Sequence, residues 1–145
     1  MVPATSTPNA AGTSTQATTP ATNASSNYKP PAGAGNGNAI VAAAYKYLNV
    51  PYKWGGMSMS GVDCSGLTSL AHKAVGISLS RTSGAQGRGG KPVPNMASAL
   101  PGDVVCYSGH VGIYIGGGKM IHAPHTGDVV KIANVYGSPW FRRYW

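Results

Sequence analysis

The amino-acid sequence predicts an α+β fold, with helices in the first half of the domain and an antiparallel sheet in the second. Apolar residues recur at helical spacing in residues 39–48 and 64–75. From Asp103 onward, apolar and polar residues alternate instead, and turn residues separate the alternating runs. Helices followed by a block of strands are typical of α+β folds, because βαβ units would interleave the two.

Residues 1–38 are predicted to form a flexible linker, and residues 39–145 a single domain. The linker consists almost entirely of Ala, Thr, Ser, Pro, Asn and Gly, with Lys29 as its one charge. It has too few apolar side chains to offset the entropy lost on ordering. Tethers of this composition are typical of extracellular proteins, where they space a domain from its anchor. A linker of no particular compartment is the alternative.

The first predicted helix covers residues 39–48, with Asn38 as its N-cap and Pro51 beyond its end. The side chains predicted to face inward are Ile40, Ala43, Ala44, Tyr47 and Leu48. The loop at residues 51–56 follows. Its aromatic residues Tyr52 and Trp54 either anchor the loop or line a cleft.

The second predicted helix carries a cysteine in its first turn. Asp63 is a favourable N-cap, and Gly76 suits the left-handed position after the last turn. The predicted buried stripe consists of Leu67, Leu70, Ala71 and Ala74. Unpaired backbone N–H groups and the helix dipole favour the thiolate of Cys64, so we expect alkylation below the pH of an ordinary thiol, whose pKa is about 8.5. The alternative is an inert, buried cysteine.

The second half of the domain is predicted to contain one helical turn and then strands. Thr82 or Ser83 caps the helical turn, and residues 87–102 form a turn-rich connection. The predicted strands cover residues 104–107, 110–115, 119–123, 129–132 and 140–145. They are predicted to form an antiparallel meander.

Charge composition excludes several classes of function. The chain has 11 Lys and Arg residues against three acids, Asp63, Asp103 and Asp128, so paired-carboxylate catalysis and carboxylate metal cages are disfavoured. The net charge of +8 favours polyanionic surroundings, such as nucleic acid, an anionic membrane or an acidic cell wall. Because no basic stripe is interleaved with aromatics, we expect no nucleic-acid partner. No apolar run is long enough to predict a transmembrane segment.

His110 and His122 are predicted to lie side by side on one face of the sheet. In an antiparallel hairpin, directly opposite residues point to the same face. Two even-numbered residues on the two strands therefore share a face when the numbers of opposite residues sum to an even number. Two registers have this property: Ile115 opposite Lys119, or Tyr114 opposite Gly118. Two adjacent histidines and a helix-end thiol suit nucleophilic catalysis, in which one imidazole takes the thiol proton and the second orients it.

Other arrangements of these side chains remain open. The histidines are either catalytic or structural, and a zinc site is a further alternative, formed by Cys64, His110, His122 and His125. That set lacks the close paired spacing of zinc motifs. Cys106 lies in an apolar run and is expected to be a packed thiol, although a disulfide with Cys64 is the alternative. His72, in the middle of its helix, is expected to be a surface or packing residue.

Six short motifs together resemble the NlpC family of papain-like bacterial cell-wall peptidases. They occupy residues 51–56, 63–67, 79–83, 101–105, 110–116 and 120–123. The resemblance covers residues 39–145 and implies a papain-like fold, in which N-terminal helices carrying the nucleophile pack on the antiparallel meander. Two positions depart from the family pattern, since Ser80 stands where proline is usual and Cys106 where a bulky apolar residue is usual.

The resemblance also implies roles for individual residues. Cys64 corresponds to the nucleophile, His110 to the general base and His122 to the residue that orients it. Tyr52 corresponds to the tyrosine that helps to hold the oxyanion. The positions that line the substrate groove are Asp63, Ser65 and Arg81. No cofactor and no metal are implied.

The implied activity is hydrolysis of peptidoglycan. The expected enzyme is a monomeric cysteine endopeptidase, secreted or wall-associated, that cleaves stem peptides between D-γ-glutamate and the diamino acid. Anionic wall polymers are further expected partners because of the positive charge. The alternatives are an amidase that uses the same residues to cut between sugar and peptide, and a wall-binding module without catalysis.

Overall fold

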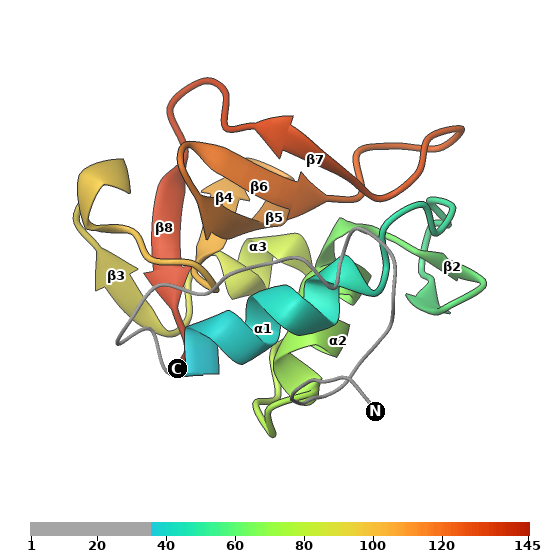
Figure 1. The fold of residues 1–145 in the computed structure, drawn as a ribbon, viewed down its shortest axis with the longest axis horizontal. Helices are drawn as coiled ribbons and strands as arrows, with labels where there is room; N and C mark the ends of the chain where they lie inside the picture. Colours follow the sequence, from blue (N-terminus) through green and yellow to red (C-terminus); the bar gives the residue numbers. More distant parts are fainter. Residues whose placement is uncertain (1–35) are drawn as a thin grey trace, which may run out of the picture.

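The computed structural model of the chain describes residues 36–145, so all but the last three residues of the predicted linker lie outside the described part. Figure 1 shows the helices gathered against one face of a sheet, which confirms the predicted α+β class. The helices are α1 (Asn36–Tyr45), α2 (Cys64–Lys73) and α3 (Ser83–Gln86), with a 3₁₀ turn at Met96–Ser98. The strands are β1 (Met57–Ser58), β2 (Gly61–Val62), β3 (Lys91–Val93), β4 (Val104–Tyr107), β5 (His110–Gly116), β6 (Lys119–His122), β7 (Lys131–Asn134) and β8 (Trp140–Arg143).

The main sheet has six strands in the order β3-β8-β4-β5-β6-β7, and all its pairs are antiparallel. The predicted meander is present in β4 to β7. β8 instead crosses back to lie between β4 and β3, and β3 itself falls within the segment predicted to be only turns. Alternation of apolar residues identifies a strand but not its neighbour, because pairing depends on contacts distant in sequence.

Helix α1 begins at Asn36, three residues before its predicted start, and ends at Tyr45. The early start depends on Gly37, which lies against the chain at Pro101 and Gly102. A Cβ atom at Gly37 would lie 2.2 Å from the carbonyl oxygen of Pro101, so only glycine allows this approach. The first turn of α1 is therefore held by the loop before β4, which a local pattern does not reveal.

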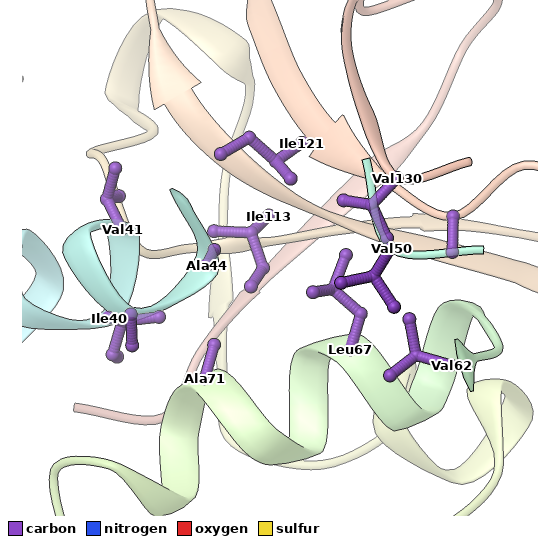
Figure 2. Close-up of a cluster of buried hydrophobic side chains, with 12 residues drawn as sticks. Ile40, Val41, Ala44, Val50, Val62, Leu67, Ala71, Ile113, Ile121 and Val130 are labelled. Atoms are coloured by element: carbon purple, nitrogen blue, oxygen red, sulfur yellow. The ribbon is translucent and has the colours of Figure 1, made fainter. Parts of the chain in front are cut away.

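The principal core lies between the two long helices and the centre of the sheet, as Figure 2 shows. Leu67 and Ala71 of α2 pack there with Ile113 of β5 and Ile121 of β6, and all four are fully buried. Leu70 of the predicted stripe is only partly buried, and Ala74 is exposed, since α2 ends at Lys73. The helix also buries a second, polar side.

The polar side of α2 consists of Thr68, Ser69 and His72. The imidazole of His72 is fully buried, with Nδ1 2.8 Å from the carbonyl oxygen of Thr68, so it is a packing residue. Burial lowers the pKa of His72 below its ordinary value and keeps the ring neutral. Helix α2 is consequently enclosed by the fold on more than one face, which leaves little freedom in the position of its first turn.

A buried ion pair joins β8 to the start of β4. The carboxylate of Asp103 is fully buried and accepts two hydrogen bonds from Arg143, at 2.7 Å from Nε and 2.8 Å from the second guanidinium nitrogen. The backbone N–H of Leu100 donates to the same carboxylate at 2.8 Å. Asp103 raises the pKa of Arg143 through these bonds, so the guanidinium stays charged. This pair secures the strand that crosses the sheet.

Among residues 36–145, no helix combines the length and apolar character needed to cross a membrane.

Candidate active site

The first turn of α2 forms as predicted, with Asp63 as its N-cap. The Asp63 carboxylate accepts a hydrogen bond from the backbone N–H of Gly66 at 2.7 Å. Gly66 itself is required for the close approach of the preceding loop, because a Cβ atom there would lie 2.2 Å from the carbonyl oxygen of Gly56. The cap therefore places the half-buried Cys64 at the start of the helix, beside the loop that carries Tyr52.

An open cleft of about 560 Å³ lies over this helix end. Six of the seven predicted site residues line it, and they come from four separate parts of the chain: Tyr52, Asp63, Cys64, Ser65, Arg81 and His110. The seventh, His122, is buried and does not line the cleft. The structure therefore brings the predicted nucleophile and base to one surface.

The two histidines contact each other as the hairpin register predicts. Ile113 pairs with Ile121 and Tyr114 with Met120, the register in which residues 115 and 119 would also be opposite. A bulge at residue 115 shifts Gly116 onto Lys119, but it lies beyond the histidines. His110 Nε2 lies 2.9 Å from His122 Nδ1, so the two rings share one hydrogen bond.

Both imidazoles are held neutral by their surroundings. Burial lowers the pKa of His110 below its ordinary value. Burial, followed by the neighbouring His110 and Lys131, lowers the pKa of His122 to about 4. At neutral pH His122 is therefore an uncharged hydrogen-bond partner, and His110 is an unprotonated base.

The protonation of Cys64 differs from the prediction made from its helix position. Burial raises the pKa of the Cys64 thiol, and the charge of Asp63 acts in the same direction. The backbone N–H groups of Val111, Ser65 and Cys64 itself do lower it, as a helix end should, but they do not outweigh burial. The resting site thus pairs a thiol with a neutral imidazole. The bond from Val111, which directly follows His110, also shows that the cysteine abuts the start of β5.

This arrangement leads to an expected pH dependence of alkylation. The rate at which iodoacetamide modifies Cys64 should be low at pH 7 and rise through an apparent pKa above about 8.5, because the thiolate is the reactive form and burial disfavours it. The measurement is mass spectrometry of samples quenched at successive times. It uses the Cys106→Ala variant, in which Cys64 is the one remaining cysteine. Alkylation that has already reached its plateau below pH 7 would contradict this and restore the helix-end expectation.

The tyrosine hydroxyl at position 52 keeps its proton at neutral pH. Burial, followed by the charges of Cys64 and Asp63, raises the pKa of Tyr52. The backbone N–H of Tyr52 donates to the carbonyl oxygen of Asp128 at 2.9 Å, and the residue also bridges to Val62, just before the helix cap. Tyr52 is therefore a protonated donor held next to the cysteine.

The three predicted groove residues form one hydrogen-bonded group. The guanidinium of Arg81 donates to Ser65 Oγ at 2.7 Å and to the Asp63 carboxylate at 3.0 Å. Asp63 also accepts the backbone N–H of Gly55 at 3.0 Å. Burial raises the pKa of Asp63, but its bonds to Arg81 and the backbone outweigh that and lower it, so the carboxylate is ionised. The Arg81 side chain is 39% exposed, which leaves guanidinium N–H groups facing the cleft.

Sequence reasoning missed part of the cleft and its support. Trp54, for which the sequence leaves a loop anchor and a cleft residue as alternatives, lines the cleft, and so do Thr82, Ser83 and Pro124, which carry no such signal in the sequence. The buried Gln86 lies behind this wall. A glutamine in a short helical turn carries no local signal of burial, because glutamine is usually exposed.

The alternative pairings of the two cysteines and the histidines do not occur. Cys64 and Cys106 are both free thiols, and Cys106 is fully buried, where burial raises its pKa to about 12. Among the described residues, no group of three or more His, Cys, Asp or Glu side chains is arranged to hold a metal ion. His125 instead lies exposed, 3.6 Å from the carboxylate of Asp128.

Comparison with known proteins identifies relatives of this chain. The model of the NlpC/P60 family matches residues 49–145, which include every predicted site residue. The protein named "Probable endopeptidase p60" from Listeria grayi is 42% identical over 131 residues, which cover 87% of this chain and 25% of that protein. The chain therefore spans about a quarter of the length of that curated relative.

Solved structures show the same similarity. The NlpC/p60 domain of the peptidoglycan hydrolase SagA is 38% identical and aligns with a TM-score of 0.65 over 72% of this chain and 95% of that domain. NlpC1 from Trichomonas vaginalis is 31% identical, with a TM-score of 0.72 over 82% of this chain and 48% of that protein.

Proposed function

Because the chain belongs to the NlpC/P60 family, we propose that it is a cysteine endopeptidase that cleaves peptidoglycan stem peptides between D-γ-glutamate and the diamino acid. The observation that carries this proposal is that a helix-end cysteine, Cys64, and a histidine, His110, line one cleft, and that the buried His122 lies within hydrogen-bond distance of His110. Binding alone would require none of these groups in this relation. The proposed roles are those of nucleophile for Cys64, base for His110 and orienting partner for His122.

The histidine pair sets the proposed direction of proton transfer. In the tautomer that we propose, His110 Nε2–H donates to His122 Nδ1, which leaves Nδ1 of His110 as the basic nitrogen. As Sγ of Cys64 bonds to the amide carbonyl carbon, its proton passes to this nitrogen. His110 then protonates the departing amine when the C–N bond breaks. A water molecule, deprotonated by His110, hydrolyses the remaining thioester and regenerates the thiol.

Tyr52 is the proposed side-chain donor to the oxyanion. The negative charge of the tetrahedral intermediate develops on the former carbonyl oxygen, beside the cysteine sulfur. A phenol that keeps its proton and lies close enough to feel the charge of Cys64 suits this task. Backbone N–H groups of the first turn of α2 are the further donors.

Arg81 is the proposed ligand of the substrate's free carboxylate. The α-carboxylate of D-glutamate remains free when the γ-carboxyl forms the scissile amide. A guanidinium with unused N–H groups at the cleft can bind such a carboxylate bidentately. Asp63 and Ser65 hold Arg81 in place, and the Asp63 carboxylate partly compensates its charge.

The proposed setting is outside the cell, secreted or associated with the wall, where peptidoglycan lies. The net charge of +8 supports attraction to anionic wall polymers, in addition to the stem peptides themselves. We propose that the domain acts as a monomer.

The bond that is cut is tested by the masses of the products. Purified protein incubated with peptidoglycan of known structure should release fragments that end in D-glutamate, leaving a new amino terminus on the diamino acid. An amidase would instead release intact stem peptides from the sugar. Detection of those intact peptides as the main product would overturn the proposed bond specificity while leaving the cysteine chemistry in place.

A further inference from the structure

Gln86 is a fully buried polar residue in α3, and its amide contacts two parts of the active site. Its Nε2 atom lies 3.1 Å from the carbonyl oxygen of Ser65 and 2.8 Å from that of Ser80. A third acceptor, Ser69 Oγ, lies at 3.0 Å. Its Oε1 atom accepts a hydrogen bond from Thr68 Oγ1. The reverse orientation of the amide would direct Oε1 at two carbonyl oxygens, so the network itself assigns the atoms.

The two carbonyls that Gln86 joins belong to the residues next to Cys64 and Arg81. Ser65 follows the nucleophile in the first turn of α2, and Ser80 precedes the arginine in the loop after that helix. The amide thus ties the loop that presents Arg81 to the helix end that presents Cys64. Its removal would leave both carbonyl oxygens without this donor, and that of Ser65 lies in the buried interior.

Gln86 is itself held by the remainder of the fold. Its backbone N–H donates to the carbonyl oxygen of Thr82 at 3.0 Å, and its own carbonyl oxygen accepts the hydroxyl of Tyr144 at 2.6 Å. One residue further, the carbonyl oxygen of Gly87 accepts the indole N–H of Trp140 at 2.7 Å. Two residues in or next to β8, Trp140 and Tyr144, therefore hold the backbone of Gln86 and Gly87 in place.

We propose that Gln86 is a positioning residue that sets the distance between Arg81 and Cys64, and through it the preference for a substrate with a free α-carboxylate. This inference rests on the proposed function, in which Arg81 binds that carboxylate while Cys64 attacks the γ-linked amide. The two groups must fit one substrate at once. A loop free to shift relative to the helix would bind the carboxylate with the scissile carbonyl out of reach.

The test compares two peptides that differ only at the carboxylate: L-alanyl-γ-D-glutamyl-diamino acid and the same peptide with the α-carboxyl as a carboxamide. For the unaltered protein, kcat/KM should be higher for the carboxylate peptide. Gln86→Met keeps the length of the side chain but removes every hydrogen bond of its amide. In this variant that preference should fall about tenfold, which corresponds to the free energy of one charge-assisted hydrogen bond.

The matched control is Ser69→Ala. Nε2 has two hydrogens for three acceptors, so removing the Ser69 hydroxyl leaves the two carbonyls to take both. This variant should keep the preference of the unaltered protein, whatever its change in melting temperature. If Gln86→Met does not fold, Thr68→Val serves instead. It frees Oε1 from its donor, and it should reduce the preference in the same direction by a smaller factor.

The outcomes separate the inference from the function on which it rests. A Gln86→Met enzyme that loses activity on both peptides equally would overturn the positioning role, since only general structure would then be affected. An unaltered protein that cleaves both peptides equally would overturn the role of Arg81, and the inference with it. An unaltered protein that cleaves neither peptide would overturn the proposed function itself.

Discussion

Replacing Cys64 by alanine is expected to lower the release of stem-peptide fragments by roughly 10⁴-fold or more, because the reaction then has no nucleophile. His110→Ala should have a comparable effect, and the double variant should be little worse than either single one, since nucleophile and base act as one unit. The measurement is the initial rate of fragment release from purified peptidoglycan, followed by mass spectrometry.

The chain offers a matched control for this experiment in its second thiol. Cys106 is fully buried in β4 and packs with Val104 and Val111. Cys106→Ala removes one sulfur from the interior and should cost about 1 kcal/mol of stability, with most of the activity retained. Equal fragment release by Cys64→Ala and the unaltered protein would remove Cys64 from the mechanism. Loss of activity in Cys106→Ala, with activity retained in Cys64→Ala, would instead identify Cys106 of β4 as the reactive thiol.

Replacing Arg143 by methionine is expected to lower the free energy of unfolding by about 3–5 kcal/mol, a large fraction of the stability of a small domain. The cause is Asp103, whose fully buried carboxylate would lose two charge-assisted hydrogen bonds and keep only that from Leu100. Methionine retains the aliphatic length of the side chain, so the change is mainly electrostatic. Urea unfolding at pH 7 measures the loss.

The neighbouring arginine of the same strand is the control for that prediction. Arg142 donates from Nε to the carbonyl oxygen of Gly87 at 3.1 Å, a neutral acceptor. Arg142→Met should therefore cost only about 1 kcal/mol. The double variant Arg143→Met, Asp103→Leu should be more stable than Arg143→Met alone, because the second substitution removes the unpaired charge. Identical unfolding midpoints for the two arginine variants would show that the buried pair contributes nothing particular.

The features that the sequence predicted correctly depend on hydrogen bonds between residues that are near each other in the chain. Asp63 caps α2 through the N–H of a residue three positions later, so the cap and the place of Cys64 in the first turn follow from a few letters. The β5–β6 hairpin turns within a few residues, and its register alone decides that His110 and His122 share a face. The roles assigned to these residues came from the family resemblance and stay predictions.

The features that were missed depend on contacts between distant parts of the chain. β8 returns to β4 across the sheet, and Arg143 reaches a carboxylate 40 residues away. Gln86 is buried only because α3, α2 and the loop before Arg81 meet around it. The periodicity of a segment predicts whether it forms a helix or a strand, but not which distant segment it contacts.

The sequence by itself determined that helices precede the strands of the meander, the capped helix that begins with Cys64, and the hairpin that pairs the histidines, because each depends on neighbours along the chain. Only the tertiary structure decided the protonation of Cys64. The backbone N–H groups at the helix end lower the pKa of the Cys64 thiol, as the sequence indicates. Burial of the thiol raises that pKa by more than the helix end lowers it. Burial is a property of the assembled fold, and here it outweighs the local field of the helix.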